Sequence, residues 1–138
     1  MTYRSVDELL AAARSRLARL DPAAAADEVA GGGALLVDIR PQWQRVEQGE
    51  ILGAHVVERN HLEWRLHPDS DARLAAARPG QHWIVFCVEG YTSSLAADAL
   101  NSIGVPATDI IGGYRAWADA GLPTGPGGTA PDGVSPAR

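Results

Sequence analysis

His82-Trp83-Ile84-Val85-Phe86-Cys87 and the residues that follow, Val88-Glu89-Gly90-Tyr91-Thr92-Ser93, decide how this chain folds. The first stretch is apolar, β-branched and aromatic, which predicts a buried strand. The segment from Thr92 to Leu100 predicts a helix with Thr92 or Ser93 as its N-cap. The short loop between strand and helix therefore passes over a helix N-terminus.

Cys87 is the only cysteine of the chain, and it stands where this strand ends. The unpaired amides and the dipole of a helix N-terminus favour an anion, and they therefore favour the thiolate form of a cysteine. Gly90 permits a positive φ, so that successive loop N–H groups can converge on an anion. The pattern predicts a reactive thiolate. The alternative is a small buried hydrophobic residue that merely ends a strand.

The size and charge of the chain limit its class. A chain of 138 residues suits one domain. All 12 basic residues are arginine, which excludes lysine chemistry, and the net charge of -5 offers no footprint for nucleic acid. The single cysteine and the lack of a long apolar stretch favour a soluble cytoplasmic protein without membrane contact. We expect neither a metal nor another cofactor, because the histidines have no ligand spacing: His55, His61, His67 and His82.

Helical and strand patterns alternate along the chain. Capping signals and apolar periodicity predict helices over 5–20, 21–29, 92–103 and 114–120, short helical segments over 61–66 and 71–77, and strands over 34–38, 55–58, 82–87 and 108–111. This alternation predicts an α/β fold with a central parallel sheet, flanked by helices on both faces, and a ligand site at the carboxyl ends of the strands. Asp38 and Cys87 both lie at such ends.

Three regions follow from the same patterns. We expect residues 1–20 to form an amphipathic helical extension, residues 21–123 the α/β domain, and residues 124–138 a flexible tail rich in glycine and proline.

Four segments in order resemble the rhodanese-homology domain family: Leu36-Val37-Asp38-Ile39-Arg40, Gly49-Glu50-Ile51-Leu52-Gly53-Ala54, Cys87-Val88-Glu89-Gly90-Tyr91-Thr92 and Gly112-Gly113-Tyr114-Arg115-Ala116-Trp117. The resemblance implies the rhodanese-like three-layer fold. It also implies a sulfurtransferase in which a cysteine takes a sulfane sulfur from a donor, holds it as a persulfide and passes it to a nucleophile.

The resemblance also implies roles for individual residues. Cys87 is the expected nucleophile, and the loop amides are expected to hold the persulfide: those of Val88, Glu89, Gly90, Tyr91, Thr92 and Ser93. The hydroxyl of Thr92 or Ser93 adds a hydrogen bond, and Asp38 and Arg40 support the site. Because there is no second cysteine, the sulfur must leave to an external acceptor: a small thiol, cyanide or a partner protein. The oligomeric state stays open.

Departures from the family pattern bear on the substrate. Many family loops carry basic residues after the cysteine, whereas this loop has Val88 and Glu89. A carboxylate at the mouth predicts weak thiosulfate binding and a persulfide as donor, unless Glu89 is only a solvated rim residue. Arg45 stands where the family often has a glutamate, so Arg40 is expected to pair with Glu47 or Glu50, to meet substrate or to be structural. Asp38 is expected to be a scaffold carboxylate rather than a base.

The segment after the second strand combines a cation with a large aromatic side chain. We expect Arg59 to face the substrate. Trp64 is expected either to form an apolar wall or, like Trp83 and Trp117, to lie in the core. Tyr91 is expected to guard the entrance or to contact an acceptor.

The cysteine loop admits two other functions. Cell-cycle phosphatases and the related arsenate reductases have an arginine six positions after the cysteine, whereas this chain has Ser93 there. The second alternative is a regulatory or binding module that uses Cys87 as a redox sensor or not at all.

Overall fold

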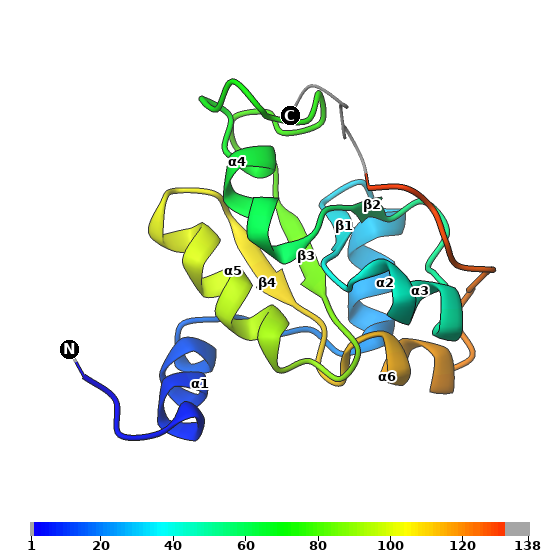
Figure 1. The fold of residues 1–138 in the computed structure, drawn as a ribbon, viewed down its shortest axis with the longest axis horizontal. Coiled ribbons are helices and arrows are strands. Elements are labelled where there is room, and N and C mark those ends of the chain that lie inside the picture. The colour runs from blue at the N-terminus through cyan, green and yellow to red at the C-terminus, as the bar shows by residue number, and fades with distance from the viewer. Residues whose placement is uncertain (1, 132–138) are drawn as a thin grey trace.

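A four-stranded parallel sheet forms the centre of the protein (Figure 1). The computed structural model describes residues 2–131. The strands are β1 (Leu35–Asp38), β2 (His55–Val56), β3 (Trp83–Phe86) and β4 (Ala107–Asp109), in the order β2-β1-β3-β4. Val37 of β1 is in register with Val85 of β3 and with His55 of β2. The strands predicted from the sequence are all present, with ends that differ by up to two residues.

Helices cover both faces of this sheet. The helices are α1 (Val6–Ser15), α2 (Pro22–Ala30), α3 (Gln42–Gln48), α4 (Leu62–Leu66), α5 (Thr92–Ser102) and α6 (Gly113–Asp119), with a 3-10 turn, η1, at Arg59–His61. Val37 and Val85 face a core shared with α4 and α5, whereas Leu36 and Ile84 face a core shared with α2 and α6. This alternation follows from the two-residue period of a strand. The predicted three-layer α/β fold is therefore confirmed.

The first helix begins as predicted and ends early. The Ser5 hydroxyl accepts a hydrogen bond from the Glu8 amide at 3.0 Å, but α1 ends at Ser15 rather than at residue 20. Leu20 instead bridges to Ile110 in parallel, and its amide donates to the Asp109 carbonyl at 3.1 Å. The helical spacing of Leu17 and Leu20 was thus misleading, because these side chains pack on the body of the domain in an extended segment.

Two further helix predictions need correction. Residues 71–77 form turns rather than a helix, because Leu74 and Ala77 reach the core from an irregular chain. Conversely, the sequence analysis missed α3. Trp43 and Val46 of this helix are 63% and 59% exposed, so the helix has no apolar face toward the core for periodicity to detect.

Part of the predicted tail is bound to the domain. Gly125 and Glu50 exchange two backbone hydrogen bonds of 2.8 Å, and the Thr129 hydroxyl donates to the Glu50 carboxylate at 2.6 Å. This segment, orange to red in Figure 1, returns from α6 toward α3. Residues 124–131 therefore differ from the expected flexible tail, and 132–138 lie outside the described residues.

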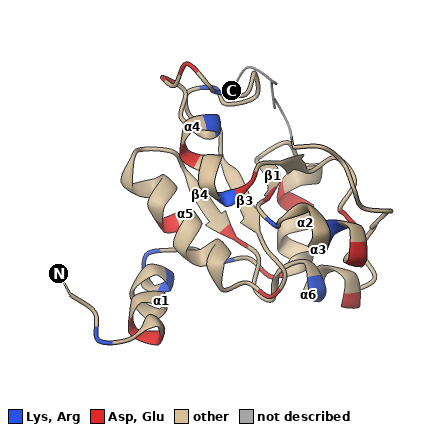
Figure 2. Cartoon of the chain, viewed as in Figure 1, with Lys and Arg blue, Asp and Glu red and all other residues tan. Residues whose placement is uncertain are grey.

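Charged residues of both signs are spread over the elements rather than separated (Figure 2). Within residues 2–131, no helix has the length and apolarity needed to cross a membrane.

Candidate active site

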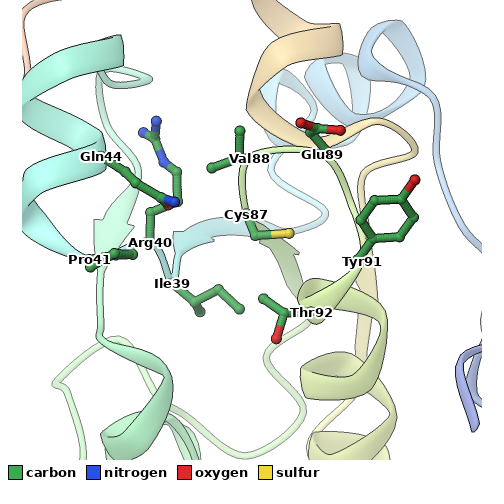
Figure 3. Close-up of a pocket in the computed structure, with 9 residues that line it drawn as sticks. All are labelled: Ile39, Arg40, Pro41, Gln44, Cys87, Val88, Glu89, Tyr91 and Thr92. Carbon is green, nitrogen blue, oxygen red and sulfur yellow. The ribbon is translucent and has the colours of Figure 1, made fainter. Parts of the chain in front are cut away.

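Cys87 lies at the base of a cavity of about 310 Å³ at the carboxyl ends of β1 and β3 (Figure 3). The thiol residue is only 7% exposed. One wall comes from the turn between β1 and α3, and the other from the cysteine loop; the lining residues are Ile39, Arg40, Pro41, Gln44, Cys87, Val88, Glu89, Tyr91 and Thr92. Three of these residues were not predicted: Ile39 and Pro41 flank Arg40 in the turn after β1, and Gln44 lies in α3, a helix that the sequence did not predict.

Gly90 fixes the shape of the cysteine loop. Its φ of +87° is in the left-handed region, and its amide donates to Cys87 Sγ at 3.3 Å. A Cβ at this position would lie 3.0 Å from the Gly112 nitrogen and 3.1 Å from the Ile110 carbonyl oxygen. Only glycine satisfies both the backbone conformation and the close packing.

The start of α6 holds two loop carbonyls. The Tyr114 amide donates to the Cys87 carbonyl at 2.8 Å, and the Arg115 amide donates to the Val88 carbonyl at 3.0 Å. In a trans peptide the N–H points opposite to the C=O, so the amides of Val88 and Glu89 point away from α6. The carbonyls of the loop thus face α6, whereas its amides face away from α6. An anion-binding site requires amides that are free to donate in this way.

The start of α5 differs from the prediction. Tyr91 is the N-cap, without a side-chain hydrogen bond, so the assignment of Thr92 or Ser93 as the cap was wrong. Ser93 is buried, and its hydroxyl donates to Asp109 at 2.8 Å instead of serving the helix end. Thr92 lines the cavity. The amides of Thr92 and Ser93 have no acceptor within the helix, whereas that of Ser94 donates to the Tyr91 carbonyl at 3.1 Å.

Asp38 and Arg40 form a buried ion pair at 2.6 Å. Burial raises the pKa of Asp38, and the hydrogen bonds from Arg40 oppose that effect. Arg40 also donates to the Gly49 carbonyl at 2.8 Å and lies 4.2 Å from the centre of the Tyr114 ring. Its guanidinium points away from Cys87 in Figure 3. Arg40 is therefore structural, and the expected pairing with Glu47 or Glu50 was wrong.

Two other ion pairs explain the departures seen in the sequence. Arg45 forms a buried ion pair with Glu50 at 2.9 Å. Glu50 is therefore not available to Arg40, which pairs with Asp38 instead. At the rim, Glu89 pairs with Arg115 at 2.9 Å, with both side chains half exposed. The carboxylate of Glu89 is thus partly balanced.

The residues expected at the mouth are not all brought together. Arg59 pairs with Glu63 at 2.8 Å and lines a neighbouring depression with Ile39, Pro41, Glu58 and Asn60, so it does not line the Cys87 cavity. Trp64 is 61% exposed and is neither core nor cavity wall. Trp83 and Trp117 lie in the core as predicted. Tyr91, 60% exposed, lines the mouth.

A polar network behind the loop was missed by the sequence analysis. Buried Asp109 accepts hydrogen bonds from Ser93, Ser94 and Arg19. Arg14 and Arg19 both donate to the Gly90 carbonyl, at 2.7 and 3.1 Å. No local pattern reveals these contacts, since they join residues 15 or more positions apart, and those of Arg14 and Arg19 with Gly90 span more than 70.

The described residues contain no group of three or more histidine, cysteine or acidic side chains placed to hold a metal. Cys87 is the thiol among the residues that line the cavity, and the Gly90 amide donates to its sulfur.

Comparisons with known proteins agree with this geometry. The most similar structures include a Rhodopseudomonas palustris protein of unknown function, described as a possible tyrosine phosphatase, which is 29% identical with a TM-score of 0.80 over 90% of this chain and 96% of its own. Thiosulfate sulfurtransferase from Pseudomonas aeruginosa is 24% identical with a TM-score of 0.66, over 83% of this chain but 20% of its own. A rhodanese-like domain protein from Staphylococcus aureus is 19% identical with a TM-score of 0.60, over 76% and 95%. No curated protein sequence matches.

The family model of the rhodanese-like domain matches residues 21–120, from the start of α2 to the end of α6. The cysteine loop and the start of α6, whose amides bind the loop carbonyls, both lie inside this range. The chain therefore belongs to the rhodanese-like domain family.

Proposed function

We propose that this protein is a sulfurtransferase that carries a sulfane sulfur on Cys87. The observation that carries the proposal is the geometry of the cysteine loop. Cys87 Sγ accepts a hydrogen bond from the Gly90 amide at the base of an open cavity. The carbonyls of Cys87 and Val88 accept hydrogen bonds from the start of α6. Such a site stabilises a thiolate and, after the reaction, a persulfide anion. The thiosulfate sulfurtransferase among the similar structures is consistent with this chemistry.

The reaction has two displacement steps. The Cys87 thiolate attacks the outer sulfur of a donor; the new S–S bond forms as the donor's own S–S bond breaks, and the donor leaves with the electron pair as a thiolate or as sulfite. An acceptor nucleophile then attacks the outer sulfur of the Cys87 persulfide. The acceptor takes that sulfur, and the cysteine thiolate is regenerated. No net oxidation of the protein occurs.

An organic or protein persulfide is the donor class that we propose. The cavity walls include the apolar side chains of Ile39, Pro41 and Val88, and the only guanidinium among the lining residues, that of Arg40, is occupied by Asp38 and Gly49. A small dianion such as thiosulfate finds no available cation there. The Glu89–Arg115 pair at the rim adds little net charge.

The acceptor is external, because Cys87 is the only cysteine and no internal disulfide can discharge the persulfide. A small thiol, cyanide or a partner protein can accept the sulfur. We propose a reducing compartment, the cytoplasm, as the setting in which the lone thiol stays available.

A phosphatase is the second candidate, because one similar structure is described as a possible tyrosine phosphatase. Cysteine phosphatases of this architecture clamp the phosphate with an arginine, but Ser93 occupies that position and its hydroxyl is bound to Asp109. The geometry favours sulfur transfer. The regulatory-module alternative predicts a Cys87 that oxidises without turnover.

Steady-state assays decide among these functions. Purified protein and Cys87→Ser are given glutathione persulfide or thiosulfate as donor with cyanide or a thiol as acceptor, and in parallel an aryl phosphate. We expect Cys87-dependent transfer, faster from the persulfide than from thiosulfate, and no phosphate release. Phosphate release without sulfur transfer would establish the second candidate. Neither activity, with a freely alkylated Cys87, would favour the regulatory module.

A further inference from the structure

The N-terminal segment reaches the cysteine loop although it lies outside residues 21–120, which carry the family match. Arg14 of α1 donates through Nη2 to the Gly90 carbonyl at 2.7 Å and through Nε to the Ser94 hydroxyl at 3.1 Å. Its guanidinium carbon also lies 5.5 Å from the centre of the Tyr91 ring. One side chain thus contacts three successive parts of the site: the loop, the mouth and the first turn of α5.

Arg14 binds Gly90, the residue whose amide donates a hydrogen bond to the sulfur of Cys87. Gly90 donates its amide to Cys87 Sγ, and its carbonyl accepts hydrogen bonds from Arg14, from Arg19 and from the Ser94 hydroxyl. The peptide that follows is trans, so the Tyr91 amide points away from the two guanidinium groups. Holding the Gly90 carbonyl therefore fixes the orientation of the Gly90–Tyr91 peptide, and it prevents that carbonyl from turning toward the sulfur.

The two arginines differ in charge balance. Arg19 forms an ion pair with buried Asp109 at 2.8 Å. Within residues 2–131, Arg14 forms no ion pair; it contacts a carbonyl, a hydroxyl and an aromatic ring. A partly buried, uncompensated cation stabilises a nearby anion because water screens it less than at the surface.

We propose that Arg14 is a positioning residue of the Cys87 site, which makes α1 a working part of the sulfurtransferase. It holds the Gly90–Tyr91 peptide, next to the Gly90 amide that donates to the sulfur, and adds a positive charge behind the loop. The inference rests on the proposed function, yet it concerns the reactivity of the thiol itself. It can therefore be tested without any sulfur donor.

Arg14→Gln and Arg16→Gln form a matched pair for this test. Both remove one positive charge from the same segment, but Arg16 pairs with Asp98 on the surface of α5 at 2.7 Å and does not contact the loop. The readouts are the rate of Cys87 alkylation by iodoacetamide as a function of pH, the kcat and KM of sulfur transfer, and the thermal unfolding midpoint. Arg14→Lys is the conservative variant, because it retains the positive charge but lacks the planar guanidinium with its fork of N–H donors.

Arg14→Gln is expected to slow alkylation at neutral pH about tenfold, to move the pH profile upward and to lower kcat more than KM. Arg16→Gln should stay within about twofold of the wild type, since an exposed ion pair contributes little. Arg14→Lys should recover part of the rate. The other charged groups around the loop are unchanged in all three variants: Arg19, Asp38, Arg40, Glu89, Asp109 and Arg115.

Equal effects of Arg14→Gln and Arg16→Gln would show that α1 only stabilises the fold, and would overturn the inference. If Arg14→Gln does not fold, Arg14→Lys is the test of the inference. An alkylation rate of Arg14→Lys equal to that of the wild type would contradict positioning by the guanidinium. A wild type that takes up no sulfur, with alkylation still dependent on Arg14, would refute the proposed function while leaving the positioning role intact.

Discussion

Gly113 packs directly against the carbonyl oxygen of Cys87: a Cβ built on this glycine would lie 2.5 Å from that oxygen. The next residue, Tyr114, donates its amide to the same oxygen at 2.8 Å. The cysteine loop therefore packs directly on the backbone of α6, and a side chain at Gly113 would push the loop away from this helix.

Gly113→Ala should lower the free energy of unfolding by about 2 kcal/mol and reduce sulfur transfer, because it combines a φ of +61° with a backbone clash. Gly121→Ala is the matched control, since Gly121 has a φ of +74° but nothing within 4 Å of its Cβ position. Denaturant unfolding and transfer assays are compared for both. An equal loss of activity in the two variants would show that backbone strain alone, rather than the support of the loop, explains the effect.

Glu89→Lys should raise the rate with thiosulfate relative to the rate with glutathione persulfide, because it replaces a carboxylate at the cavity rim by a cation beside Arg115. Arg115→Gln is the opposing variant: it leaves Glu89 unbalanced and should shift the donor ratio the other way. The measurement is the ratio of kcat/KM values at low and high salt. A ratio that neither variant changes would mark Glu89 as a solvated rim residue.

Acid should weaken the attachment of residues 125–129. Burial raises the pKa of Glu50, but the hydrogen bonds from Thr129 and Arg45 outweigh burial. The pKa of Glu50 is therefore lower than its ordinary value. A carboxyl whose pKa is lower in the folded state contributes stability above its unfolded pKa, and this contribution is lost as the pH falls through the folded pKa. The thermal midpoint should therefore drop on acidification below the ordinary range of glutamate.

Glu50→Gln tests this assignment. The variant leaves the buried Arg45 without its carboxylate, so it should cost about 3 kcal/mol at neutral pH and flatten the acid dependence of the unfolding midpoint. An acid dependence as steep as that of the wild type would assign the effect to other carboxylates.

Local signals predicted the frame of the site correctly. The β-branched run at 82–87 formed β3, Asp21-Pro22 capped α2 with the Asp21 carboxylate 2.8 Å from the Ala24 amide, and Cys87 lies where the strand ends. Each depends on neighbours in the sequence. The parallel sheet followed from the alternation of these elements.

The missed features depend on contacts between distant residues. Ser93 looked like a helix cap, but Asp109, 16 positions away, takes its hydroxyl. Arg14 and Arg19 reach Gly90 across more than 70 residues. The glycine-rich segment after residue 124 gave no apolar pattern, yet backbone pairing with Glu50 binds it to the domain.

The most direct test of sulfur transfer through Cys87 is the intact mass of the reduced protein after brief exposure to glutathione persulfide and, separately, to thiosulfate. Cys87→Ser is measured beside it, and cyanide or a thiol is added afterwards. We predict a gain of one sulfur atom in the wild type only, larger with the persulfide and reversed by the acceptor. An unchanged mass with both donors, while the thiol remains open to alkylation, would contradict the account.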